Sequence, residues 1–212
     1  LMNVLIISNY SDDVRIEIWS SLGIWFSSCI LCSYIYIYDI FSTFKVKDKK
    51  VDFIINSPIS VFYILLSGVV FSIIIAIVEL IVSYFMIAIL TENYISFYHF
   101  FCLALSVLPV SLLFVSIAMI LSLYDKYNIG LSFVALFCVS IIQLSQIQII
   151  YSIDEPIYYI PVFNMISNSR AFISPKYVVS FFPILMMYII SNFSLALSLY
   201  GSVKIINKVY ER

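Results

Sequence analysis

The sequence predicts an all-α membrane protein, a polytopic bundle of transmembrane helices that forms one domain over residues 1–212. Hydrophobic residues make up 63% of the chain and charged residues only 11%, whereas a soluble domain is about 45–50% apolar and about 25% charged. The mean hydropathy is +1.09. So few charged side chains cannot cover a globule with polar surface. Most of the chain is therefore expected to contact lipid, which excludes a soluble enzyme and a nucleic-acid-binding protein.

Long uncharged runs mark the expected spans, because crossing about 30 Å of hydrocarbon takes about 20 apolar residues. Glu79 interrupts one such run without a turn signal around it, so a single long helix is expected to pass through it. We predict five spans, at about 18–38, 63–90, 98–122, 130–151 and 178–200.

The chain begins with Leu1 before Met2, followed by an apolar stub over residues 2–8 that is too short to cross a membrane. This stub lacks the basic n-region and the small-residue cleavage site of a signal peptide. Two interpretations remain open. Either a start codon is written literally as leucine, or an upstream segment is missing and would complete a sixth span.

The first span contains Cys29 and Cys32, whose spacing occurs in redox and metal sites. No second pair accompanies them, and the only histidine is His99. All four cysteines lie in apolar stretches, where cysteine packs as a small hydrophobic residue. We therefore expect neither a metal site nor a redox site.

The distribution of Lys and Arg predicts the orientation, because cytoplasmic loops are enriched in basic residues. Eight of them fall on one side of the expected spans: Lys45, Lys47, Lys49, Lys50, Lys126, Lys204, Lys208 and Arg212. Three fall on the other side: Arg15, Arg170 and Lys176. We therefore expect a plasma-membrane protein with its C-terminus in the cytoplasm and its N-terminus outside.

Residues 44–60 follow the first span and are expected in the cytoplasm. Charged residues alternate along the first half, and Val51, Phe53, Ile54 and Ile55 follow. This pattern favours a short interfacial helix, which Ser57-Pro58 ends because the residue before proline avoids the α region. The segment is either an ordinary positive-inside loop or a docking element that transmits force from a soluble partner.

Glu79 is the one ionisable residue deep inside an expected span. An acid at that depth costs about 2.5–3.5 kcal/mol on insertion scales, so it should face protein or a water-filled cavity. Ser72 and Ser83 are expected on the same helix face. Glu79 is either a pathway residue or an acid hydrogen-bonded to a neighbouring helix.

The fourth span has a polar stripe in which Ser140, Gln143 and Gln146 follow at intervals of three residues. Such side chains either hold helices together through hydrogen bonds or line an aqueous path. The long external segment 151–176 follows, with aromatic residues recurring between polar ones. We expect a structured external cap built of interfacial or re-entrant helices.

No catalytic motif is present: the sequence contains no phosphate-binding G-x-x-x-x-G-K-[ST], no G-x-S-x-G and no histidine cluster. The chain is therefore not expected to be an enzyme or to hold a cofactor of its own. The net charge of −1 provides no field that would attract nucleic acid.

Several segments together resemble the type-2 ABC transporter permease family. The string Asp52-Phe53-Ile54-Ile55-Asn56-Ser57-Pro58-Ile59-Ser60 resembles the cytoplasmic motif of that family, and Gly68 follows at the matching distance. Tyr159-Ile160-Pro161-Val162-Phe163-Asn164 resembles the string in the family's last external loop. The likeness covers about residues 15–205. The chain departs from the family in having five expected spans where six are usual, and in having Lys49, Lys50 and Val51 where a glycine precedes the motif.

The resemblance implies a permease domain that exports a hydrophobic or amphipathic substrate such as a peptide, lipid or drug. Two copies of a cytoplasmic ABC ATPase would bind ATP and Mg²⁺ and press on the coupling residues Asp52, Phe53, Ile54, Ile55, Ser57 and Pro58. A second permease subunit, identical or related, would complete the pathway. Tyr159, Pro161, Phe163 and Asn164 would belong to the external cap.

Two other functions stay open. A non-transporting membrane scaffold or immunity protein that binds a peptide or partner is consistent with the small number of spans. An ion-coupled secondary transporter would depend on Glu79 alone, and the sequence has no internal repeat of the kind such transporters show.

Overall fold

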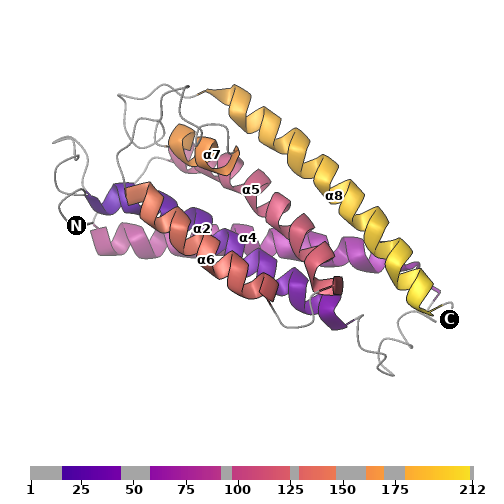
Figure 1. Ribbon diagram of the computed structural model, residues 1–212. Helices are drawn as coiled ribbons and strands as arrows, with labels where there is room; N and C mark the ends of the chain where they lie inside the picture. The colour runs from indigo at the N-terminus through magenta and orange to yellow at the C-terminus, as the bar shows by residue number, and fades with distance from the viewer. Residues whose placement is uncertain are drawn as a thin grey trace.

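The computed structural model describes residues 16–43, 58–91, 97–124, 129–146, 161–169 and 180–210. Six helices occupy these ranges (Figure 1). They are α2 (Ile16–Thr43), α4 (Val61–Thr91), α5 (Phe97–Tyr124), α6 (Ile129–Gln146), α7 (Pro161–Ser169) and α8 (Phe181–Tyr210).

Four of the described helices, α2, α4, α5 and α8, are long and apolar enough to cross a membrane. The apolar part of α6, Ile129–Gln143, is shorter than these four. The described residues thus form the all-helical bundle of a membrane protein, as the composition predicts. The expected fourth span, 130–151, lies partly on α6 and partly outside the described residues, so the total of five spans stays a prediction.

The helices extend past the ends that the uncharged runs predict. α2 continues through Asp39 to Thr43, and α8 continues through Lys204 to Tyr210. A charged side chain ends the hydrophobic run without breaking the backbone hydrogen bonds of the helix. Hydropathy therefore marks where the apolar part ends, and the helix itself ends further along.

The start of α4 has a clear local cause. Pro58 and Ile59 form a bend, and the Ser60 carbonyl accepts hydrogen bonds from the amides of Tyr63 at 3.0 Å and Ile64 at 3.4 Å. Ser60 thus occupies the N-cap position of α4, where serine is favoured.

The long helices run up and down along one bundle, with α2 at its centre (Figure 1). α2 packs against α4, α5 and α6, whereas α8 packs chiefly against α5. Of the four long helices, α2 and α5 are accordingly the most buried. α7 lies at the end of the bundle where α5 and α8 begin (Figure 1).

Small polar side chains join α2 to its neighbours. The Ser27 hydroxyl donates to the Cys138 carbonyl of α6 at 3.1 Å, and the Cys138 thiol donates back to the Ser27 carbonyl at 3.7 Å. The Cys29 thiol donates to the Ala76 carbonyl of α4 at 3.4 Å. Small residues of this kind let helix backbones approach closely in lipid, where burying apolar surface contributes little to helix association.

The contact between α5 and α8 follows the same rule. The hydroxyls of Ser116 and Ser194 lie 2.6 Å apart and share a hydrogen bond. Ser116 also donates to the Leu113 carbonyl of its own helix at 2.7 Å. A serine pair therefore holds α8 on α5.

An aromatic cluster fills the bundle between α2, α4 and α5. Trp25 is buried beside Tyr84, with ring centroids 6.3 Å apart, and Tyr84 contacts Phe100 at 4.6 Å. Aromatic pairs at such distances add to the packing energy of the surface they bury.

Gly68 lies where α4 crosses α2. A Cβ atom built at this position would lie 3.3 Å from the Ile37 Cδ1 atom and 3.7 Å from that of Ile40. The absence of a side chain thus allows the two helices to approach closely. Because the nearest atoms are the ends of flexible side chains, an alanine methyl fits with small adjustments and a larger residue does not.

We expect Gly68→Leu to lower the free energy of unfolding by about 1–3 kcal/mol through overpacking. Gly68→Ala should change it little, because the helix propensity gained offsets the crowding. Thermal unfolding in mild detergent measures both. Gly201→Leu is the matched control, since a Cβ at Gly201 meets nothing within 4 Å. Equal losses for the two leucine variants would contradict the close approach at Gly68.

The short helix α7 is anchored to the rest of the bundle in two ways. Val162, Met165 and Ile166 are buried on one face, and α7 packs against α8, α5 and α2. The Asn168 side chain donates to the Ser180 carbonyl and accepts from the Ser180 amide, both at 2.8 Å. This double hydrogen bond links the end of α7 to the residue that precedes α8.

Large apolar side chains cover the outer faces of α4 and α8. Phe71, Phe85 and Met86 of α4 are exposed, as are Phe193 and Tyr200 of α8. Exposed apolar surface of this extent is what a bilayer solvates.

Candidate functional site

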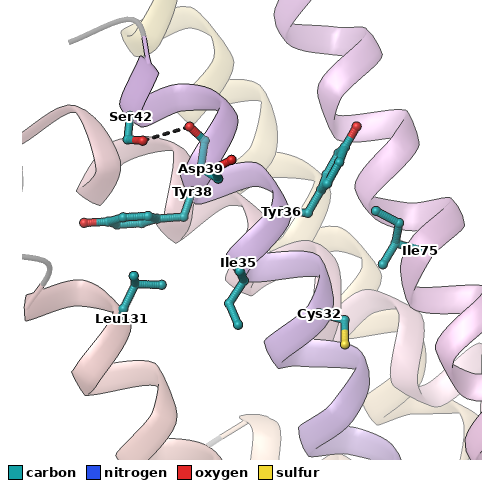
Figure 2. A pocket seen from close by; sticks show the side chains of 8 residues that line it. All are labelled: Cys32, Ile35, Tyr36, Tyr38, Asp39, Ser42, Ile75 and Leu131. Atoms are coloured by element: carbon teal, nitrogen blue, oxygen red, sulfur yellow. Dashed lines mark hydrogen bonds between the residues drawn. The ribbon is translucent and has the colours of Figure 1, made fainter. Parts of the chain in front are cut away.

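A cavity of about 660 Å³ opens in the half of the bundle where α2 ends and α4 and α6 begin (Figures 1 and 2). Most of its lining comes from α2, with one residue each from α4 and α6. The lining residues are Cys32, Ile35, Tyr36, Tyr38, Asp39, Ser42, Ile75 and Leu131.

The α-helical repeat places the α2 residues of the cavity. Cys32, Ile35, Asp39 and Ser42 follow at intervals of three and four residues and so share one side of the helix. Figure 2 shows the tyrosines on the two flanks of this line: Tyr36 projects beside Ile75 of α4, and Tyr38 projects toward the side of Leu131 on α6. The cavity therefore lies along α2, with a tyrosine on either flank.

Burial differs along the lining. Tyr38 is buried, and Tyr34 stacks on it with ring centroids 5.8 Å apart. Tyr36 and Cys32 are half-buried, whereas Asp39 is exposed. The tyrosine on the α6 side is thus fixed by its packing, while the carboxylate is accessible from outside the bundle.

Of the described residues that line the cavity, Asp39 is the one that carries a charge. The Ser42 hydroxyl donates to the Asp39 backbone carbonyl at 2.8 Å (Figure 2), so this bond does not use the carboxylate. The side chain remains an anionic hydrogen-bond acceptor at the rim of an otherwise neutral and largely apolar space.

Glu79, the predicted pathway residue, is half-buried on α4. The Cys29 thiol contacts the α4 backbone at Ala76, one turn before Glu79, and Glu79 lies within electrostatic range of the Cys29 and Cys32 thiols. Glu79 therefore faces α2, and it lies beyond the inner end of the cavity, which Cys32 lines. Sequence reasoning predicts such a placement against protein, because lipid would disfavour the acid.

The predicted serine neighbours of Glu79 are both buried. Ser83 donates to the Glu79 carbonyl at 2.7 Å, and Ser72 donates to the Val69 carbonyl at 2.7 Å. Both hydroxyl protons are thus used within α4. Neither serine is among the residues that line the cavity.

Gln143 of the predicted polar stripe in the fourth span is not among the residues that line the cavity. Gln143 is exposed on α6, and Ser140 beside it donates to the Leu136 carbonyl of the same helix at 3.0 Å. The side chain of Gln146 falls outside the described residues. The stripe and the cavity are therefore separate features of the described chain.

The coupling and cap residues are described only in part. Pro58 is exposed at the bend before α4, whereas Asp52, Phe53, Ile54, Ile55 and Ser57 lie outside the described residues. In the cap, Pro161 is the first residue of α7, and Asn164 is half-buried on it. The α7 backbone includes Phe163, while Tyr159 lies outside the described residues.

The described residues contain no group of three or more His, Cys, Asp or Glu side chains that could hold a metal ion. All four cysteines have free thiols, and Cys29, Cys102 and Cys138 are buried. Cys29 and Cys138 instead donate to backbone carbonyls of neighbouring helices.

Sequence reasoning missed the residues that define the cavity. Asp39 follows the first uncharged run, so the sequence indicates only that it lies at the end of a span. The available signal was its spacing, because Cys32, Tyr36 and Asp39 recur at nearly one helical turn. Asn168 was missed as well, although its neighbour Asn164 was assigned to the cap.

Comparison of the chain with protein-family models, with curated proteins and with solved structures finds no match. The fold and the cavity are therefore interpreted from their own chemistry.

Proposed function

We propose that the chain is the membrane-spanning subunit of an ATP-driven ABC transporter that exports a hydrophobic or amphipathic substrate. The chain would span the plasma membrane five times, with its C-terminus in the cytoplasm. A separate cytoplasmic ATPase, present in two copies, would hydrolyse ATP with Mg²⁺. A second permease subunit, identical or related, would form the other half of the pathway.

The observation that carries this proposal is the cavity along α2. Its volume of about 660 Å³ lies within the range of about 300–1,000 Å³ that is typical of small-molecule sites. Apolar residues and tyrosines line it, with one carboxylate at the rim. In the predicted orientation the cavity lies in the cytoplasmic half of the membrane, where a substrate dissolved in the inner leaflet can enter.

The position of the coupling segment supports the same function. Residues 44–60 join α2 to α4, and these two helices provide all the described lining residues except Leu131. A force applied to this segment by a cytoplasmic ATPase would act directly on both helices. Movement of these helices relative to each other would change the side of the membrane to which the cavity opens.

We expect Glu79→Gln to lower ATP-dependent substrate movement at least about tenfold. Glutamine keeps the shape of the Glu79 side chain and removes its charge, which lies between α2 and α4 near the cavity. The measurement is substrate uptake into proteoliposomes that contain the chain and its ATPase. Glu17→Gln neutralises an acid of α2, at the end of that helix opposite to the cavity, and should leave uptake unchanged.

Replacing the ATPase by a catalytically inactive variant should abolish substrate uptake in the same assay. Uptake that continues with this inactive ATPase would overturn the proposed function. Uptake at the normal rate by the Glu79→Gln variant would refute a role for Glu79 in the pathway, but it would not contradict the proposed transporter function.

The second candidate is a membrane scaffold or immunity protein that binds a peptide or partner without transport. The broad exposed apolar faces of α4 and α8 favour it, since another membrane helix can cover them as well as lipid can. Protection against a peptide antibiotic that persists with an inactive ATPase would select this candidate.

A further inference from the structure

We propose that the cavity along α2 binds a lipophilic cation, a positively charged group carried on an apolar body. The charge would lie at Asp39, and the apolar body would lie among Ile35, Ile75 and Leu131. This inference names the substrate class of the transporter proposed above and in that sense rests on it. Binding is nevertheless measurable on this chain without the ATPase.

The charge of the lining selects the sign of the ligand. Among the described residues that line the cavity, Asp39 is the one charged residue, and the others are neutral. A carboxylate beside apolar walls and a bilayer attracts a cation more strongly than it would in water, because the surroundings screen the charge less. An anion of equal shape would be repelled.

The two tyrosines that line the cavity also favour a positively charged ligand. Tyr36 and Tyr38 flank the Asp39 side of α2 in opposite directions (Figure 2). A cation within about 6 Å of a tyrosine ring is attracted by the negative face of the ring. Either ring, Tyr36 on one flank or Tyr38 on the other, would add to the attraction that the Asp39 carboxylate provides.

The apolar walls select the rest of the ligand. Ile35 comes from α2, Ile75 from α4 and Leu131 from α6, so three helices contribute aliphatic surface to one space. A volume of about 660 Å³ far exceeds what a bare metal ion fills. Calcium takes 6–8 oxygen ligands, whereas the described lining offers a single carboxylate. An organic cation with an apolar body fits both the volume and the lining.

The test uses the purified full-length chain in nanodiscs of zwitterionic lipid, with binding of tritiated tetraphenylphosphonium measured against empty nanodiscs. Saturable binding is expected. Tetraphenylborate, which has the same shape and the opposite charge, should not compete. A chain that shows no saturable binding, or that binds tetraphenylborate more tightly, would overturn the inference. The second result would mean that the four lysines of residues 44–50 determine the selectivity.

Three variants locate the site. Asp39→Asn should weaken binding by up to about fivefold, the upper end of the range for an accessible ion pair. Tyr36→Leu should weaken it about two- to fivefold by removing one ring. Glu17→Gln, an acid-to-amide change about 33 Å away along α2, is the matched control and should bind as the unchanged chain does. Unchanged affinity in both Asp39→Asn and Tyr36→Leu would place the binding elsewhere and overturn the inference.

Two further measurements distinguish a loss of cation binding from a failure of the variant to fold. Asp39→Glu retains the charge and should restore binding, and the helical circular dichroism of every variant shows whether it folds. If Asp39→Asn does not fold, Tyr36→Leu decides the result. Saturable cation binding without ATP-driven transport would refute the proposed function alone. ATP-driven transport of a neutral substrate, with no cation binding, would refute this inference alone.

Discussion

Trp25→Ala is expected to cause the largest loss of stability of any single substitution in the described core, about 3–5 kcal/mol. The Trp25 side chain is 1% exposed, and it packs beside Tyr84, which in turn contacts Phe100. Removing the indole leaves a void between α2, α4 and α5 where dispersion contacts are lost on every wall. Lipid chains cannot enter a void closed by three helices.

Unfolding in mild detergent, followed by near-ultraviolet circular dichroism, measures this loss. Phe193→Ala is the matched control, because Phe193 is an aromatic residue 67% exposed on the outer face of α8. Its replacement should change the free energy of unfolding by less than about 0.5 kcal/mol. Similar losses for the two variants would contradict the assignment of Trp25 to the core.

Trp25→Phe separates ring packing from the polar group of the indole. The Trp25 Nε1 group is buried without a hydrogen-bond partner in the part of the chain that the structure describes. Phenylalanine keeps most of the aromatic contact and removes this donor, and an unsatisfied buried donor costs about 1–3 kcal/mol. We therefore expect Trp25→Phe to be far milder than Trp25→Ala.

Replacing Ile54, Ile55 and Pro58 together by glutamate is expected to abolish co-purification of the ATPase. In the proposed complex the apolar side of the coupling segment docks in a groove of the ATPase. Three buried carboxylates without partners would cost far more than such an interface provides. Affinity purification from cells that produce both proteins measures the effect as the amount of ATPase per permease.

Asn207→Glu is the control for this experiment. Asn207 is exposed near the C-terminal end of α8, which the positive-inside rule places on the same side of the membrane. It adds a negative charge there without touching the coupling segment. A triple variant that retains the ATPase at the normal ratio, while Asn207→Glu also retains it, would refute the docking role of residues 44–60.

The sequence predicts the helices of this protein well because lipid imposes a simple requirement. An apolar run of sufficient length must become a helix, since every backbone polar group has to be satisfied within the segment. The expected runs 63–90 and 98–122 accordingly lie within α4 and α5. The helix ends were less predictable, as Asp39 and Lys204 show, because hydrogen bonds continue past the apolar region.

The candidate site was less predictable than the fold. The expectation that Glu79 faces protein or a water-filled cavity rests on the cost of an acid in lipid, which depends on one residue alone. The cavity depends on three helices that are distant in sequence, and Leu131 joins Ile75 in its lining only because α4 and α6 both pack on α2. Hydropathy carries no information about which helices become neighbours.

The central position of α2 has a consequence for biosynthesis. The hydrogen-bond partners Ser27 and Cys138 are separated by 111 residues. At about 5–20 residues per second, the ribosome needs on the order of 6–22 s to reach Cys138 after Ser27 has been made. During that interval α6 has not been made. The side of α2 that carries Ser27 therefore lacks the helix against which it packs in the complete bundle. In a nascent chain stalled before Cys138, a crosslinker placed on the Ser27 side of α2 should therefore react with surrounding molecules, and it should react with α6 once the chain is complete.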